Sequence, residues 1–169
     1  MILKNNFPND EKGASYMDFK EENILLDVAV ASKEELFDVI ANYAYDSGYV
    51  ANAADTSAAF NEREAEYSTG LQEGFAIPHA KAETVLAPTV LFIRLTKAIE
   101  WETFDDSAVK NVFALMVPKK DEGTVHLEML SRLATALLEE DFIQQVQQSE
   151  DKTKLVETIK KEMIGERII

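Results

Sequence analysis

Two histidines, His79 and His126, are the side chains in this sequence best suited to nucleophilic attack or proton transfer near neutral pH. The chain contains no cysteine, which excludes disulfides, thiolate nucleophiles and cysteine metal sites. A histidine in a protein more often packs or lies on the surface than performs chemistry. The residues around each histidine must therefore decide between these interpretations.

His79 lies near the end of an extended segment, residues 75–80, and directly follows Pro78. Proline fixes its own φ and pushes the preceding residue, Ile77, into an extended conformation. Phe75, Ile77 and His79 then point to one face of the segment. This arrangement predicts an imidazole held rigidly beside an apolar patch, as suits a positioned nucleophile.

The loop before His79, residues 68–74, reads Ser-Thr-Gly-Leu-Gln-Glu-Gly and holds two of the six glycines of the chain. Glycines permit positive φ angles and let backbone N–H groups approach a bound anion closely. Thr69, Gly70 and Gly74 are therefore candidates to support a phosphate. An isolated G-x-x-x-G pattern is equally typical of a plain helix-to-strand turn, so the loop residues alone leave both interpretations open.

Arg63 lies on the apolar face of a predicted helix, where a guanidinium needs an anionic partner. The partner is either a carboxylate of the protein in a structural ion pair or a bound anion. The adjacent Glu64 is a poor candidate because neighbouring residues of a helix do not face each other. Arg63 is thus a candidate to neutralise charge on a bound anion.

His126 falls in the first turn of a helix predicted to begin with Thr124 as its N-cap. A helix N-terminus disfavours an imidazolium ion and favours a nearby anion. A neutral His126 beside backbone N–H groups is therefore a good phosphate contact. The alternative is an interior histidine that only packs.

Together these residues suit phosphoryl transfer, which mainly needs in-line positioning and neutralisation of charge on oxygen. The sequence contains no Walker-type G-x-x-x-x-G-K-[ST], no G-x-S-x-G and no H-E-x-x-H motif. We therefore expect neither a cofactor nor a metal. A metal-dependent hydrolase that uses both histidines and an acid stays open, although no spacing signature supports it.

The elements that must position these residues follow from apolar periodicity, capping residues and turns. Strands are predicted at residues 23–27, 89–95 and 112–117. Pro78 makes residues 75–80 an edge strand or a strand end, because proline cannot donate to a ladder. Helices are predicted at residues 32–48, 55–68 and 142–147, and from residues 124 and 149 onward. Strands interleaved with helices predict a mixed α/β fold with helices on both faces of the sheet.

Three helices are predicted in more detail. In the first, Ser32 and Glu35 form a capping box, and Gly48 ends the helix. The inner face of the second is predicted to carry Ala59, Phe60, Arg63 and Tyr67. The apolar stripe of the third is predicted to carry His126 at its start, followed by Leu127, Leu130, Leu133, Ala134, Leu137 and Leu138.

Size and charge limit the function further. The 169 residues suit one compact domain, and a formal net charge of −14 argues against binding nucleic acid or anionic lipid. Such a charge attracts a partner with a basic face, although it also serves solubility. No apolar run is long enough to span a membrane and the N-terminus lacks a secretory signal, so we expect a cytoplasmic protein without direct membrane insertion. Residues 1–17 read as a polar N-terminal extension, with Met17 as an alternative start.

The string Arg63-Glu64, Ser68-Thr69-Gly70 and Gly74-Phe-Ala-Ile-Pro-His79 closely resembles the active-site stretch of the fructose/mannitol-type EIIA domains of the bacterial phosphotransferase system. Residues 112–118 with 126–134, and residues 23–27 with 32–34, resemble further blocks of that family. The resemblance covers roughly residues 18–164, and it assigns residues 18–169 to a type-2 EIIA domain.

The resemblance implies a mixed five-stranded sheet between helices and a phosphoryl-carrier function. His79 matches the phosphorylated histidine, which takes its phosphoryl group on Nε2 from phospho-HPr. Arg63 and His126 match the arginine and the second histidine that flank it. The phosphoryl group then passes to an EIIB domain and on to a sugar that enters through a membrane EIIC.

One departure and one alternative accompany this resemblance. Gln72 stands where the family commonly has a glycine, which predicts a less tightly wound loop. The nitrogen-type EIIA proteins, which signal by phosphorylation-dependent protein binding, resemble the same sequence. A regulatory role is therefore the alternative to sugar transport.

Overall fold

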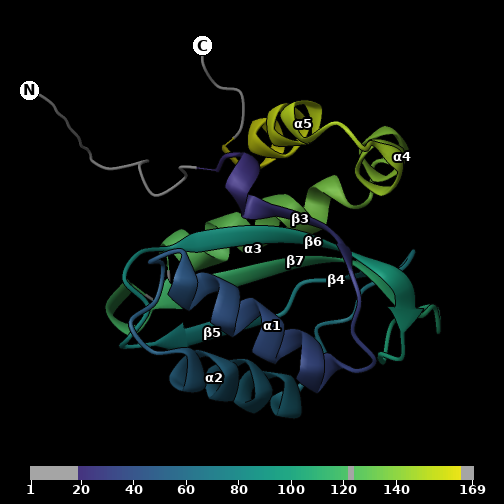
Figure 1. Ribbon diagram of the computed structural model, residues 1–169. Helices are drawn as coiled ribbons and strands as arrows, with labels where there is room; N and C mark the ends of the chain where they lie inside the picture. The colour runs from purple at the N-terminus through teal and green to yellow at the C-terminus, as the bar shows by residue number, and fades with distance from the viewer. Residues whose placement is uncertain (1–18, 122–123, 165–169) are drawn as a thin grey trace, which may run out of the picture.

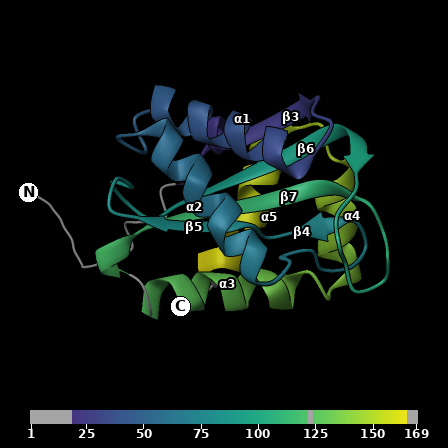
Figure 2. The ribbon, with the colours of Figure 1, turned by 90° about the horizontal axis from the view of Figure 1, so that it is seen from below.

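A computed structural model describes residues 19–121 and 124–164 (Figure 1). Its elements in chain order are η2 (Glu21–Asn23), β3 (Ile24–Val28), α1 (Lys33–Asp46), α2 (Ala53–Glu66), β4 (Phe75–Ala76), β5 (His79–Ala82), β6 (Thr89–Ile99), β7 (Val109–Pro118), η3 (Lys119–Asp121), α3 (Thr124–Ala136), α4 (Glu140–Gln148) and α5 (Lys152–Ile164). Helices α1 and α2 cover one face of the sheet, and α3, α4 and α5 cover the other (Figures 1 and 2). The predicted fold class, one α/β domain with helices on both faces, is confirmed.

The sheet is five-stranded and mixed, with the order β3-β6-β7-β4, and β5 also pairs with β7. Strand β6 runs antiparallel to β7, whereas β4 and β5 run parallel to it. The break between β4 and β5 falls at Ile77 and Pro78, as expected for a proline at a strand end. His79 therefore begins an edge strand, in register with Leu115 of β7.

The core divides into two layers, one on each side of the sheet. Phe75 and Ile77 belong to the layer under α3, α4 and α5, where stacked phenylalanines dominate. Ala76 and Ala80 belong to the layer under α1 and α2. This alternation confirms that Phe75 and Ile77 point to one face. The small side chains of the alanines let α2 approach the β4–β5 edge.

Helix α1 begins and ends as predicted. The Ser32 side chain accepts a hydrogen bond from the Glu35 backbone N–H at 3.1 Å. The Glu35 carboxylate closes the capping box one residue early, on the backbone N–H of Ala31 at 2.8 Å. At the other end Gly48 has a φ of +83°, and the N–H groups of Gly48 and Tyr49 return to the last helical turn.

The prediction for α2 was wrong at both ends. The helix begins at Ala53, because the Asn52 side chain caps it by accepting from the backbone N–H of Asp55 at 2.9 Å. Asp55 thus lies at the third helical position instead of the first. The helix ends at Glu66, and Tyr67 is extended and 75% exposed, so Tyr67 does not belong to the inner face.

The predicted apolar stripe of α3 was also partly wrong. Between residues 127 and 136 of this helix the buried side chains are Met129, Leu133 and Ala136, and Leu137 directly after it is buried as well. Leu127 is 61% exposed, Leu138 is 74% exposed, and Ala134 is exposed too. In a segment rich in Ala and Leu, one face of the helix includes only some of the apolar residues. Here the face that packs against the sheet is the one that contains Met129. Leu127 and Leu130 face a different feature, described below.

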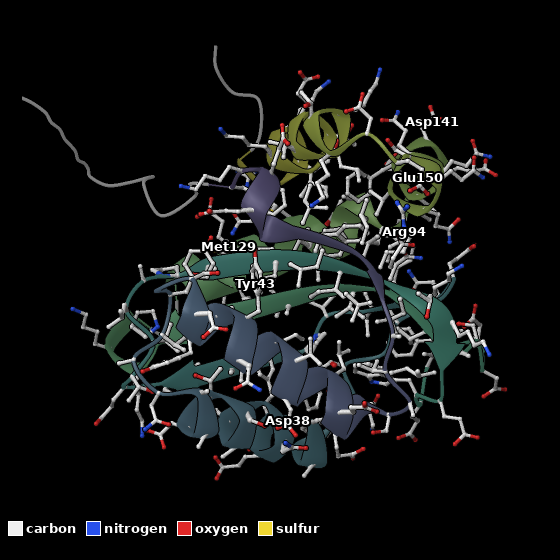
Figure 3. All side chains as sticks on the ribbon, viewed as in Figure 1. Asp38, Tyr43, Arg94, Met129, Asp141 and Glu150 are labelled. Atoms are coloured by element: carbon white, nitrogen blue, oxygen red, sulfur yellow. The ribbon has the colours of Figure 1, made fainter. Side chains whose placement is uncertain are left out.

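Arg94 is a buried charge that fastens α4 to the sheet (Figure 3). Its guanidinium donates to the backbone carbonyl of Val146 near the C-terminal end of α4, where a cation is favoured. It also pairs with the exposed Glu150 at 3.3 Å. None of the helices in the described ranges is both long and apolar enough to cross a membrane.

Candidate active site at the edge strand

A pocket of about 390 Å³ opens where α2, β5 and α3 meet at the edge of the sheet. Its lining comprises Ala59, Glu62, Arg63 and Glu66 of α2, His79 and Lys81 of β5, and Leu127 and Leu130 of α3. The structure therefore brings two of the predicted site residues, His79 and Arg63, into one pocket. Parts of the chain that are far apart in the sequence supply its walls.

The imidazole of His79 is held in one orientation by the backbone beside it. His79 is 7% exposed, and its Nδ1 lies 2.7 Å from the carbonyl oxygen of Ile77. A carbonyl oxygen can only accept, so Nδ1 carries the proton and donates it to Ile77. In the neutral ring, Nε2 is then the nitrogen that carries a lone pair. The backbone N–H of Leu115 holds the carbonyl of Pro78 at 2.9 Å and so fixes the segment to β7.

Arg63 is half-buried and lines the pocket from the last turn of α2. One guanidinium nitrogen donates to the backbone carbonyl of Tyr67 at 2.8 Å. A guanidinium carries five N–H donors, so this bond does not exhaust its capacity. Among the side chains that the structure describes, no carboxylate pairs with Arg63. The structural ion pair considered from sequence is therefore not found in that part of the chain.

The charges around the pocket are mixed. Glu62 and Glu66 are exposed on the α2 side, and Lys81 is exposed on β5, two residues after His79. Sequence reasoning missed Lys81, although the period of two along a strand places positions 79 and 81 on the same face. The two cations offset the two carboxylates, so an incoming dianion does not meet a purely acidic wall.

The predicted phosphate-loop residues do not line this pocket. The backbone N–H of Thr69 donates to the Glu64 carboxylate at 2.9 Å, and the N–H of Gly70 donates to the Ser68 hydroxyl at 3.1 Å. At Gly70 a Cβ atom would lie 2.3 Å from the backbone carbonyl oxygen of Glu102, so only glycine fits there. These residues shape the chain that leads to His79.

The loop that contains Gln72 ends in a tight turn. The N–H of Phe75 bonds to the carbonyl of Gln72 at 3.2 Å, and the two residues between them, Glu73 and Gly74, have φ angles of +59° and +79°. Positive φ at both central positions is typical of the turns that close β-hairpins. The Gln72 side chain donates to the backbone carbonyl of Leu137 at 3.3 Å, which ties the loop to the end of α3.

The loop after β6 anchors the other side of this turn. The Asp105 carboxylate accepts from the backbone N–H of Glu73 at 3.0 Å, and the Ser107 hydroxyl accepts from the N–H of Gly74 at 3.0 Å. The hydrogen bond from Glu73, together with one from the Ser107 hydroxyl, lowers the pKa of Asp105 to about 2.

Glu64 is a second residue that sequence reasoning missed. Its side chain is only 6% exposed, and its carboxylate accepts from the Thr69 N–H and hydroxyl and from the indole N–H of Trp101. Glu64 and Arg63 point in different directions, as expected for neighbours in a helix. Trp101 lies 37 positions along the chain, so no local pattern could have revealed this contact.

His126 lies in the first turn of α3, whose first helical residue is Thr124, the position predicted to be the N-cap. Its side chain lies outside the described residues, so its contact with a phosphate stays a prediction. No group of three His, Cys, Asp or Glu side chains able to hold a metal ion occurs among the described residues.

Residues 17–162 match the family model described as "Phosphoenolpyruvate-dependent sugar phosphotransferase system, EIIA 2". The chain belongs to this family of phosphoryl-carrying phosphotransferase components. It is 36% identical over 131 residues to the fructose-specific EIIA component of Haloferax volcanii, covering 78% of this chain and 84% of that protein.

Two solved structures share the fold. The nitrogen regulatory protein IIA-Ntr of Neisseria meningitidis superposes with a TM-score of 0.73 at 29% identity, covering 82% of this chain and 94% of that one. Enzyme IIAMTL of Escherichia coli, in a complex with phosphorylated enzyme IIBMTL, superposes with a TM-score of 0.69 at 23% identity, covering 82% and 94%. The resemblance to EIIA domains stated from sequence is thus confirmed.

Proposed function

We infer that this chain carries a phosphoryl group on Nε2 of His79, which it accepts from phospho-HPr and passes to an EIIB domain for coupled uptake and phosphorylation of a fructose/mannitol-class sugar. The hydrogen bond between His79 Nδ1 and the Ile77 carbonyl is the observation that carries this proposal. This bond supports a proton on Nδ1 and the nucleophilic lone pair on Nε2.

The transfer step balances without a cofactor. The Nε2 lone pair of His79 attacks the phosphorus of the donor phosphohistidine, and the donor P–N bond breaks as the new one forms. The bonding electrons return to the donor nitrogen, and Nδ1 of His79 keeps its proton throughout. The Ile77 carbonyl stabilises the positive charge that develops on the imidazole as Nε2 gives up its lone pair.

Residues around His79 offset the negative charge on the three phosphoryl oxygens. Arg63 and Lys81 line the same pocket as His79 and supply positive charge from α2 and β5. His126 lies one helical turn before Leu130, which lines the pocket, so we assign it to the α3 side of the phosphoryl group. Thr69, Gly70 and Gly74 support the phosphate indirectly, by shaping the loop that precedes His79.

Two observations support the proposed partners: the net charge of the chain and a solved complex of a relative. A net charge of −14 attracts donors and acceptors with basic faces, and an EIIB partner is bound to the Escherichia coli IIAMTL in its solved complex. The fructose-specific relative supports the sugar class. We assign residues 18–169 to the EIIA domain and residues 1–17 to an extension, in a cytoplasmic protein.

A nitrogen-type regulatory role is the second candidate. The structural match at 29% identity to a nitrogen regulatory protein favours it. His79 is phosphorylated in both roles. In the transport role the phosphoryl group passes to a sugar, whereas in the regulatory role the phosphorylation state controls binding to another protein.

The proposal is tested by reconstitution. Phospho-HPr, this protein and membranes that carry a matching EIIBC are mixed with fructose or mannitol, and sugar phosphate is measured. Formation of sugar phosphate that disappears with His79→Ala supports the transport role. Phosphorylation of the protein without sugar phosphate from any tested sugar favours the regulatory role, and labelling that survives His79→Ala contradicts both.

A further inference from the structure

We propose that Glu64 is a positioning residue, which sets the orientation and the proton position of the His79 imidazole through a chain of hydrogen bonds. The effect of Glu64 on phosphoryl transfer rests on the function proposed above. The effect of Glu64 on the orientation of the imidazole does not.

The chain of hydrogen bonds begins at the buried Glu64 carboxylate. Oε2 accepts from the backbone N–H of Thr69 at 2.9 Å, and Oε1 accepts from the Thr69 hydroxyl at 2.6 Å. One carboxylate thus accepts two hydrogen bonds from Thr69, and these fix both the backbone and the side chain of Thr69. Charge-assisted bonds of this kind are shorter and stronger than neutral ones.

The chain continues from Thr69 to the imidazole. The Thr69 carbonyl accepts from the backbone N–H of Ile77 at 3.0 Å, and the Ile77 carbonyl accepts from His79 Nδ1 at 2.7 Å. The N–H and the carbonyl that take part flank the same Cα atom of Ile77. A displacement of Thr69 therefore moves the acceptor that holds the Nδ1 proton.

The other end of the chain is anchored in the core beneath α1 and α2. Oε2 of Glu64 also accepts from the indole N–H of Trp101 at 2.9 Å. The Trp101 ring packs edge-on against Phe37, with 6.0 Å between ring centroids, and the ammonium of Lys33 lies 5.6 Å from the Trp101 ring centroid and 4.0 Å from the carboxylate. Glu64 thus connects this packed core to the segment that leads into the edge strand β5.

The chemistry of burial favours this interpretation over a merely structural one. A carboxylate removed from water is costly unless every strong acceptor position is used, and an apolar side chain would fill this space at lower cost. Two of the three hydrogen-bond donors to Glu64 belong to Thr69, the residue whose carbonyl accepts from the Ile77 N–H, and the third is the indole N–H of Trp101. A carboxylate needed only for packing requires no such connection.

Glu64→Ala and Glu64→Gln separate positioning from stability. Glutamine keeps the length and an acceptor oxygen for the Thr69 and Trp101 N–H groups, and its amide can donate to the Thr69 hydroxyl, so it should rescue what alanine loses. Asn23→Ala is the control, because Asn23 is a buried polar side chain that precedes β3 and donates to the Val90 carbonyl of β6 at 3.1 Å, two strands away from β5.

The first readout is the ¹⁵N NMR signature of the His79 ring, which reports the tautomer and does not depend on any partner. We expect the Nδ1-protonated form in the natural protein, Glu64→Gln and Asn23→Ala, and a mixture with the Nε2-protonated form in Glu64→Ala. The second readout is the rate of phosphoryl transfer from phospho-HPr, which we expect to fall about 100-fold in Glu64→Ala alone, as for a small misplacement of a reacting group.

A folded Glu64→Ala that keeps both the tautomer and the transfer rate overturns the proposal. If Glu64→Ala does not fold, Glu64→Met fills the same space with an apolar side chain and removes every hydrogen bond of the carboxylate, and an unchanged tautomer in that variant overturns the proposal equally. A tautomer shift in Glu64→Ala, in a protein that phospho-HPr never labels, keeps the positioning role and removes the proposed function instead.

Discussion

Arg63→Ala should slow phosphoryl transfer far more than it destabilises the fold. Loss of one charged donor from a site where negative charge develops costs about 3 to 4 kcal/mol in the transition state, or about 10² to 10³ in rate. Within the described residues, the hydrogen bond that Arg63→Ala removes is the exposed one to the Tyr67 carbonyl. Its loss should lower the free energy of unfolding by about 1 kcal/mol.

These magnitudes exclude unfolding as the cause of a slow variant. A domain of this size is stable by about 5 to 15 kcal/mol, so a loss of about 1 kcal/mol leaves nearly all molecules folded. The melting temperature should fall by about 2 to 4 °C. A rate decrease of two orders of magnitude would then come from lost charge stabilisation alone.

The assay is single-turnover labelling by phospho-HPr, combined with thermal unfolding of each variant. Arg63→Lys keeps the charge without the planar fork and should give an intermediate rate. Arg132→Ala is the control, because Arg132 is half-buried on α3 and pairs with Glu128 at 3.5 Å outside the pocket. If Arg63→Ala and Arg132→Ala transfer at the same rate, the assignment of Arg63 to the phosphoryl oxygens is wrong.

Three further predictions concern the loop before His79. The pKa of Asp105 is lowered from 3.8 to about 2 in the folded protein, so its contribution to stability is present above pH 3.8 and is lost as the pH falls toward 2. The difference in urea stability between the natural protein and Asp105→Asn should shrink over that range, and a constant difference would contradict it. Gln72→Gly should remove the bond to the Leu137 carbonyl and lower the free energy of unfolding by about 1 kcal/mol, and unchanged denaturant stability would show that this bond contributes nothing. Gly70→Ala should cost about 1 to 3 kcal/mol, because its Cβ would lie 2.3 Å from the Glu102 carbonyl oxygen, and a neutral effect in thermal unfolding would mean that the loop yields easily.

Local patterns predicted the parts of the fold that depend on near neighbours. The cap at Ser32, the glycine stop at Gly48 and the strand break at Pro78 each involve residues within a few positions, and all three were found. The start of α2 was missed because two capping residues, Asn52 and Asp55, stood three positions apart and either could serve.

Long-range packing decided what local patterns could not. Apolar periodicity placed Leu127 and Leu138 in the core, but the sheet selected the helical row that contains Met129. The pocket shared by His79 and Arg63 could be predicted because both residues belong to one recognisable motif. The bond from Glu64 to Trp101 could not, because it forms only once the β6–β7 hairpin has folded against α2.

The site of phosphorylation tests the central claim most directly. Protein with ¹⁵N-labelled histidine is incubated with phospho-HPr, and the position of phosphorus on the ring is determined by NMR, with His79→Ala labelled in parallel. The structure predicts one phosphoryl group on Nε2 of His79 and none on the alanine variant, because Nδ1 holds the proton that the Ile77 carbonyl accepts. Phosphorus on Nδ1, or undiminished labelling of His79→Ala, would contradict it.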